Sequence, residues 1–369
     1  MPIKVLIVDD SLFMRKLLSD ILSSEGIEVA GIAKSGREAL KKIPQIKPDV
    51  ITLDLVMPGW DGLTTLKHIM EEYPTPVIIL SGHSREGADI TMECMNSGAV
   101  GFILKPSGEL SLDIEKVAPE LLKLVRAASK VDVGKIRALF APTVRPVKYR
   151  AVARDRIIVI GASTGGPQTL VAILSSLPPD FSPPIIIVQH MPGIEFTRSL
   201  AEHLKRVGKL MVKVAEHNEI IARKKVYLVP GGYSMTLQKT DHRLQTTDHR
   251  PQTIDHRPQT VDREKDAEVV MRLVKDKPDA LTPSINTTMR SAAEIFNGSA
   301  IGVILTGMGS DGAEGMEAIK NSGGTTLVQD ESSLIFGMPK VVIDRGCADS
   351  VLPAGKIAER IVQLVSTVY

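Results

Sequence analysis

The sequence predicts the α/β fold class, with two doubly wound parallel-sheet domains. In the first 125 residues, short and almost wholly apolar segments alternate with stretches whose apolar residues recur at helical spacing, and this alternation returns after residue 155. Strands that are apolar throughout belong to parallel sheets covered by helices on both faces. A chain of 369 residues is also long for one hydrophobic core. We therefore expect domains over residues 1–125 and 155–369, joined by a linker over residues 126–154.

Five segments of the first domain have the length and composition of buried strands. They are residues 5–8, 29–32, 50–53, 77–80 and 101–104. In an open α/β sheet, ligands bind beyond the carboxyl ends of the strands. The polar residues found at these ends are Asp9, Asp10, Asp54, Ser81 and Lys105. The sequence therefore places a candidate site at one edge of the first sheet.

The linker is expected because the apolar pattern fades there, prolines appear, and Lys and Arg outnumber the acidic residues. In the second domain we expect strands at residues 157–160, 185–188, 301–305 and 325–328. Helices are expected over residues 165–177, from about residue 311, and over residues 354–365. Residues 226–229 and 235–237 could pair as a hairpin around Pro230, Gly231 and Gly232.

Residues 240–262 carry a tandem repeat of seven residues built on Asp-His-Arg. Its evenly spaced His242, His249 and His256 could bind a metal or an anion. The repeat is polar, contains proline and cannot form a core, so we favour a surface loop.

Composition argues against several classes of protein. Apolar residues make up 43% of the chain, yet no apolar run approaches the roughly 18 residues that a membrane span needs, so no direct membrane insertion is expected. The chain starts with a strand pattern rather than a signal peptide, and two cysteines are a thin basis for a disulfide framework. We expect a cytoplasmic protein. A net charge of +2 gives no reason to expect nucleic acid as a partner.

The acidic residues at the first sheet edge suggest phosphoryl chemistry. Asp9, Asp10 and Asp54 would repel one another unless a cation neutralises them, and Mg²⁺ prefers hard oxygen ligands. A carboxylate neutralised in this way could attack phosphorus and form an acyl phosphate. Lys105 would supply a positive charge for the phosphoryl oxygens, and Ser81 a hydrogen bond.

The motifs Val-Asp-Asp-Ser, Leu-Asp-Leu-Val-Met-Pro-Gly-Trp-Asp-Gly, Leu-Ser-Gly and Leu-Lys-Pro occur in this order. Residues 1–125 thereby resemble a two-component receiver domain, which has a flavodoxin-like fold. The resemblance implies Asp54 as the phosphoacceptor, a histidine kinase as the phosphodonor, and a rearrangement of Ser81 and Phe102 on phosphorylation. It implies a magnesium site made of Asp9, Asp10, Asp54 and the carbonyl of Val56. An acidic strand edge in an unrelated flavodoxin-like domain is the alternative.

Three polar residues of the second domain suggest a hydrolase. Ser163 lies between a strand and a helix in Gly-Ala-Ser-Thr-Gly-Gly, where helix N-terminal amides can stabilise an oxyanion. His190 ends a strand and could act as its base, while Asp311 lies in a glycine-rich turn and could orient the imidazole. The backbone amides of Thr164 and Met308 are oxyanion-hole candidates. The glycine-rich turn alone would also fit a phosphate-binding site.

The order Ser, His, Asp along the chain differs from the Ser, Asp, His order of α/β-hydrolases. The second domain carries the motifs Gly-Ala-Ser-Thr-Gly-Gly, Gln-His-Met-Pro and Leu-Thr-Gly-Met-Gly-Ser-Asp-Gly. With these motifs, both halves together resemble the chemotaxis protein-glutamate methylesterases, in which a receiver precedes a Rossmann-like esterase domain. This resemblance implies Ser163 as nucleophile, His190 as base and Asp311 as its partner. It implies Mg²⁺ for the receiver and no cofactor for the esterase.

By the same resemblance, the substrates are glutamate methyl esters on the cytoplasmic helices of chemoreceptors, and some family members also deamidate receptor glutamines. The unphosphorylated receiver is expected to cover the active site. Ser234 stands where the family usually has histidine, and Asn286 where aspartate is common. The alternative function is a response regulator whose second domain only binds a nucleotide or an acidic protein.

Overall fold

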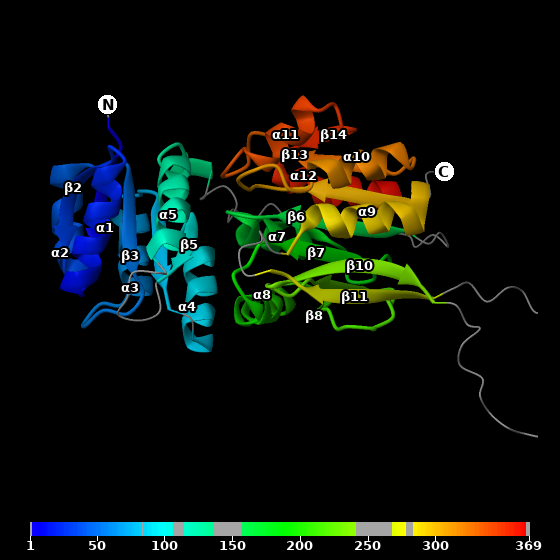
Figure 1. Cartoon of the computed structure of the whole chain (residues 1–369), viewed down its shortest axis with the longest axis horizontal. Helices are drawn as coiled ribbons and strands as arrows, with labels where there is room; N and C mark the ends of the chain where they lie inside the picture. The colour runs from blue at the N-terminus through cyan, green and yellow to red at the C-terminus, as the bar shows by residue number, and fades with distance from the viewer. Residues whose placement is uncertain are drawn as a thin grey trace, which may run out of the picture.

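The computed structural model describes residues 2–82, 84–105, 114–135, 156–240, 268–277 and 283–366. Its elements gather around two separate parallel sheets, which lie at opposite ends of the view in Figure 1. The predicted α/β class with two parallel sheets is confirmed. The tandem repeat and most of the predicted linker lie outside the described residues.

The N-terminal sheet has five parallel strands in the order β2-β1-β3-β4-β5. Their bounds are β1 Lys4–Val8, β2 Glu28–Ala33, β3 Val50–Asp54, β4 Val77–Ser81 and β5 Gly101–Leu104. All five overlap the predicted segments. Since β1 and β3 are neighbours, the residues that follow them meet at the carboxyl edge of the sheet.

Helices cover both faces of this sheet. They are α1 Leu12–Ser24, α2 Gly36–Ile46, α3 Gly62–Glu72, α4 Arg85–Asn96 and α5 Ile114–Ala128. Buried residues of α1 and α5 share one core with Val5 and Ile7, while those of α2, α3 and α4 share another with Leu6 and Val8. Alternate residues of one strand thus face opposite layers, as a doubly wound sheet requires.

The C-terminal sheet has seven strands in the order β14-β13-β12-β6-β7-β9-β8, all parallel. Their bounds are β6 Ile157–Ala162, β7 Ile185–Gln189, β8 Met211–Val214, β9 Lys225–Leu228, β12 Ala300–Ile304, β13 Thr325–Gln329 and β14 Ser350–Leu352. The central strand β6 lies between β7 and β12, so three strand ends converge near the middle of this sheet.

Helices also cover this sheet on both faces. They are α7 Gly166–Ser176, α8 Ile194–Val207, α9 Ile285–Phe296, α10 Ala313–Asn321, α11 Met338–Asp344 and α12 Ala354–Val365. Buried residues of α7, α8 and α12 pack on one side, and those of α9, α10 and α11 on the other. No described helix is long and apolar enough to cross a membrane.

The predicted hairpin around Pro230 is wrong. Strand β9 lies inside the seven-stranded sheet between β7 and β8, whereas β10 Tyr233–Lys239 pairs antiparallel with β11 Val269–Lys275 in a sheet of two strands. The physical reason is burial. Val226, Tyr227 and Leu228 are all buried, which suits a strand covered on both faces, while burial along β10 alternates.

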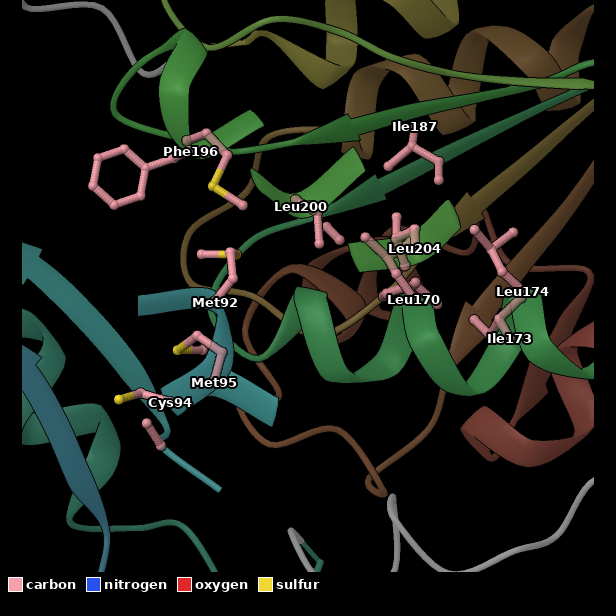
Figure 2. Packing of buried hydrophobic residues seen from close by; sticks show 14 of the residues in the cluster. Met92, Cys94, Met95, Leu170, Ile173, Leu174, Ile187, Phe196, Leu200 and Leu204 are labelled. Carbon is pink, nitrogen blue, oxygen red and sulfur yellow. The ribbon is translucent and has the colours of Figure 1, made fainter. Parts of the chain in front are cut away.

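The two units pack directly against each other. Helix α4 lies against α7 and α8, and Figure 2 shows Met92 of α4 facing Phe196 and Leu200 of α8. Gln168 Nε2 of α7 donates to the Ala99 carbonyl at 2.7 Å. The rings of Phe102 and Phe196 stack with their centroids 5.0 Å apart. The N-terminal unit is thus joined to the C-terminal unit by apolar packing as well as by hydrogen bonds.

Candidate functional site

The structure brings Asp9, Asp10 and Asp54 together at the carboxyl edge of the first sheet. One oxygen atom from each of the three carboxylates lies within 4.8 Å of the others. Asp9 and Asp54 are buried, and Asp10 is exposed. Three close carboxylates with one open side fit a hard cation such as Mg²⁺, which keeps several of its waters. The amide of Val56 donates to Asp54 Oδ1 at 3.2 Å, which places Val56 beside this cluster.

Lys105, the residue after β5, forms ion pairs with two carboxylates of the acidic cluster. Its Nζ lies 2.7 Å from Asp54 Oδ2 and 3.0 Å from Asp9 Oδ2. Burial raises the pKa of Asp54 above its ordinary value, which outweighs the lowering by the Lys105 ammonium. A buried carboxylate beside a compact cation suits a group that must accept a negatively charged phosphoryl group.

Ser81 and Phe102 lie on neighbouring strands but have different surroundings. The Ser81 hydroxyl is 2.7 Å from that of Thr91 on α4. Phe102 stacks on Phe196 of the C-terminal unit. The acidic cluster and the interface between the units are therefore linked through β4, β5 and α4.

Ser163 follows the central strand β6 in a turn with well-defined hydrogen bonds. Its amide donates to the Thr306 carbonyl at 3.0 Å, and its own carbonyl accepts from the Gly166 amide at 2.8 Å. Gly165 has a φ of +78°, which an L residue adopts only with strain, so glycine is needed at this bend. A β-carbon at Gly307 would lie 2.7 Å from Ser163 Cβ, so the Gly307 turn contacts the serine directly.

His190 follows β7, the neighbour of β6, so the two strands place Ser163 and His190 at adjacent ends. His190 Nε2 lies 2.9 Å from Asp311 Oδ2. Asp311 also accepts the amides of Ile285 at 2.8 Å and Asn286 at 3.0 Å, at the start of α9. Burial by itself raises the pKa of Asp311, but the hydrogen bonds from His190 and the two amides lower it below its ordinary value.

The ionised Asp311 fixes the tautomer of the imidazole. A carboxylate only accepts hydrogen bonds, so we assign the proton of neutral His190 to Nε2. The other ring nitrogen, Nδ1, then carries the lone pair, and it is buried with no hydrogen-bond partner in the described part of the chain. His190 is therefore set up to accept a proton at Nδ1.

The two oxyanion-hole candidates lie beside the N-terminal unit. A β-carbon at Gly101 of β5 would be 3.3 Å from Thr164 Cγ2, and Met308 packs against the core that α5 forms with Leu334 and Ile335. The N-terminal unit therefore contacts the turn that holds Ser163 at Thr164, and Met308 lies against the core that the two units share.

The sequence analysis did not identify Gln189 and Thr306. Gln189 Nε2 donates to the carbonyls of Ser163 at 2.9 Å and His190 at 3.1 Å. The Thr306 hydroxyl donates to the Thr164 carbonyl at 2.9 Å. The sequence did contain a signal for Gln189, because this polar residue ends an otherwise apolar strand. The structure shows that its side chain is buried.

The two departures from the family pattern have structural roles. Asn286 Oδ1 accepts the amides of Gly312 at 3.0 Å and Gly315 at 2.8 Å, as an aspartate oxygen also could. Ser234 Oγ donates to Asp276 Oδ2 at 3.0 Å and thereby connects the start of β10 to the residue after β11.

An acidic cluster on one parallel-sheet unit and a Ser-His-Asp set on another are typical of a hydrolase controlled by a receiver. The family model for CheB methylesterase matches residues 158–361, and that for the response regulator receiver domain matches residues 5–114. The chain belongs to the CheB methylesterase family.

Curated relatives align over almost the whole chain. A protein-glutamate methylesterase/protein-glutamine glutaminase of Thermotoga maritima is 43% identical, covering 98% of each chain. One of the same name from Archaeoglobus fulgidus is 40% identical, again covering 98% of each chain. A crystal structure of the Thermotoga maritima CheB methylesterase catalytic domain has 40% identity and a TM-score of 0.49, covering 58% of this chain and 100% of that one.

Proposed function

We propose that this protein is a phosphorylation-regulated protein-glutamate methylesterase. It hydrolyses glutamate methyl esters on the cytoplasmic domains of chemoreceptors and releases methanol. This demethylation of the receptors serves chemotaxis adaptation. It acts in the cytoplasm, where these receptor domains and a histidine kinase are found. The receiver covers residues 1–125 and the esterase residues 155–369. The observation that carries the proposal is the 2.9 Å contact of His190 with Asp311 next to the Ser163 turn.

In the first chemical step, Ser163 Oγ attacks the ester carbonyl and His190 Nδ1 takes its proton. Asp311 stabilises the imidazolium that forms. The amides of Thr164 and Met308 donate to the oxyanion of the tetrahedral intermediate. The carbon–oxygen bond to methanol then breaks, and His190 returns the proton to the leaving methoxide.

In the second step, water attacks the acyl-Ser163 carbonyl while His190 again accepts a proton. The bond to Ser163 breaks, the proton returns to Oγ, and a free glutamate carboxylate is released. A glutamine substrate would react in the same sequence, with ammonia as the leaving group. Deamidation therefore needs no further residues.

In the receiver, Asp54 accepts the phosphoryl group from a histidine kinase. Asp9, Asp10, Asp54 and the Val56 carbonyl would hold Mg²⁺, which would supply the positive charge that neutralises the attacking carboxylate. Lys105 stabilises the added charge, and Ser81 and Phe102 adjust to it. The contact of Gly101 with Thr164 supports a gate at the esterase site, which phosphorylation opens by lowering the affinity of the two faces for each other.

The test is methanol release from a methylated receptor cytoplasmic fragment. Wild type and Ser163→Ala are compared, each with and without Mg²⁺ plus a small-molecule phosphodonor. Release by wild type alone, increased by the phosphodonor, supports both the esterase and its gate. Release that the donor leaves unchanged contradicts the gate. No release from folded wild type, with substrate that another esterase cleaves, would favour a response regulator whose second domain only binds.

A further inference from the structure

We propose that Gln189 and Thr306 form a buried polar clamp that orients the Ser163 turn for oxyanion stabilisation. Both are positioning residues, because their side chains bind backbone groups of the turn. Their proposed effect is to fix two consecutive peptide planes, those that follow Ser163 and Thr164. This inference rests on the proposed hydrolase function.

The first peptide plane is set by two hydrogen bonds to the Ser163 carbonyl. One comes from Gln189 Nε2 at 2.9 Å and the other from the Gly166 amide at 2.8 Å. In a trans peptide, the carbonyl and the following N–H point in opposite directions. Because the Ser163 carbonyl is held toward Gln189, the Thr164 N–H points away from Gln189. A donor fixed before the reaction gives the greatest stabilisation of an oxyanion.

The same Gln189 amide also connects the nucleophile to the base. Its Nε2 reaches the His190 carbonyl at 3.1 Å, so one side-chain amide group bridges the backbones of Ser163 and His190. Both acceptors are carbonyl oxygens, which requires the NH₂ end of the side chain at this position.

Thr306 holds the second peptide plane. Its hydroxyl donates to the Thr164 carbonyl, which belongs to this plane, at 2.9 Å. Its own carbonyl accepts the Ser163 amide, which belongs to the peptide plane before Ser163, at 3.0 Å. The hydroxyl in turn accepts the Ile335 amide at 2.9 Å. Thr306 is fully buried, so water does not compete for these bonds.

Stability alone gives a poor account of Gln189. Its Oε1 is buried, has no hydrogen-bond partner among the residues that the structure describes, and lies where a side chain at Gly166 would have to go. An unpaired buried carbonyl lowers stability, so an apolar residue of equal size would serve packing at least as well. The side-chain amide is explained instead by the hydrogen bonds that its nitrogen donates to the Ser163 and His190 carbonyls.

The test compares three variants in the full-length protein. Gln189→Met keeps the size of the side chain and removes the donor. Thr306→Val keeps the shape and removes the hydroxyl, while Thr306→Ser restores the hydroxyl. We expect kcat for methanol release to fall about 10-fold to 100-fold in Gln189→Met and Thr306→Val with KM unchanged, less than the roughly 100-fold to 1,000-fold that follows removal of an oxyanion donor. Thr306→Ser should recover most of the wild-type kcat.

A second readout separates this inference from the choice of substrate. A fluorophosphonate labels the nucleophilic serine through a charged intermediate that needs the same donors, and its labelling rate should fall in parallel with kcat. Wild type that releases no methanol but labels at Ser163 contradicts the methylesterase alone, while equal labelling of wild type and Gln189→Met overturns the clamp. Thr306→Ser as slow as Thr306→Val also overturns it, and this pair decides the question if Gln189→Met does not fold.

Discussion

At the residue scale, the proposed reaction depends on a carboxylate with a precise set of partners. Asp311 accepts hydrogen bonds from the His190 imidazole and from two backbone amides of α9. These donors keep Asp311 ionised although it is largely buried, and the ionised form selects the imidazole tautomer with its lone pair at Nδ1. The clamp residues Gln189 and Thr306 act on the backbone of the same turn.

Asp311→Asn should disable the base while leaving the fold intact. The amide group can donate as well as accept, so the tautomer with the proton on Nε2 is no longer enforced. We expect kcat to fall roughly 10⁴-fold, as when the aspartate of a serine-protease triad is replaced by asparagine. Steady-state methanol release measures this change, and circular dichroism provides the folding control. A fall of only a few-fold would contradict the role of Asp311.

Asp311 also predicts a pH dependence of stability. Its pKa in the folded protein lies below its ordinary value of 3.8, so the ionised carboxylate stabilises the fold above that value. This contribution is lost as the pH falls through the folded pKa. The difference in the free energy of unfolding between wild type and Asp311→Asn should therefore shrink from about pH 6 to about pH 3. Urea denaturation at several pH values measures it, and a constant difference would contradict the prediction.

At the element scale, a side chain of α9 caps the N-terminus of α10 and so connects the two helices. Gly312, at the N-cap of α10, has no side chain for this purpose. Asn286 Oδ1 instead accepts the amides of Gly312 and Gly315. The Asp311 turn lies between the ends of these two helices, so this cap also holds the partner of His190.

Asn286→Ala should lower the free energy of unfolding by about 1–2 kcal/mol, because it removes a helix cap and takes away the acceptor of the Gly315 amide, while the Gly312 amide keeps Asp311 Oδ1 as an acceptor. Glu294→Ala, an exposed position on the same helix, is the matched control and should change stability little. Chemical denaturation of the three proteins gives the comparison. Equal losses for both variants would show that the cap contributes nothing.

At the scale of the whole molecule, the acidic cluster and the Ser163 turn lie at the edges of different sheets, and the two units that contain these sheets share one interface. Ser81 contacts Thr91 on α4, and α4 packs on α8. Elsewhere in the interface, Gly101 of β5 lies against Thr164. A shift of the receiver face would therefore change the surroundings of the esterase site directly.

Ser199→Asp should weaken this interface and raise the basal rate. Ser199 is buried on α8, and its hydroxyl lies 3.4 Å from the Ala88 carbonyl of α4, so a carboxylate there would be desolvated and repelled. Each ~1.4 kcal/mol of lost docking energy gives about a tenfold rise in the undocked population. Methanol release without a phosphodonor measures the effect, and the donor should then add little.

Lys205→Ala, at an exposed position on the same helix, is the control and should behave as wild type. A basal rate for Ser199→Asp equal to that of wild type, with stimulation by the phosphodonor intact, would contradict the gate at this interface.

The two parallel sheets and the polar residues at their strand ends could be predicted from the amino-acid pattern alone. Buried parallel strands must be apolar throughout, so a polar residue at the end of such a strand is visible without coordinates. Asp9, Asp54, Ser163 and His190 were found in this way. Regular spacing also predicted α12 with its observed bounds, Ala354–Val365.

The pairing of strands and of polar groups, in contrast, depends on contacts between distant parts of the folded chain. The partner of β10 is β11, more than thirty residues further along the chain, because burial rather than proximity in sequence selects the pairing. The tautomer of His190 depends on Asp311, and Asp311 depends on amides of α9 that no local pattern connects to it. Gln189 and Thr306 act through backbone carbonyls, which every residue carries. A polar residue at the end of an apolar strand, such as Gln189, can be noticed in the sequence, but the backbone groups that it binds become known only when the chain is folded.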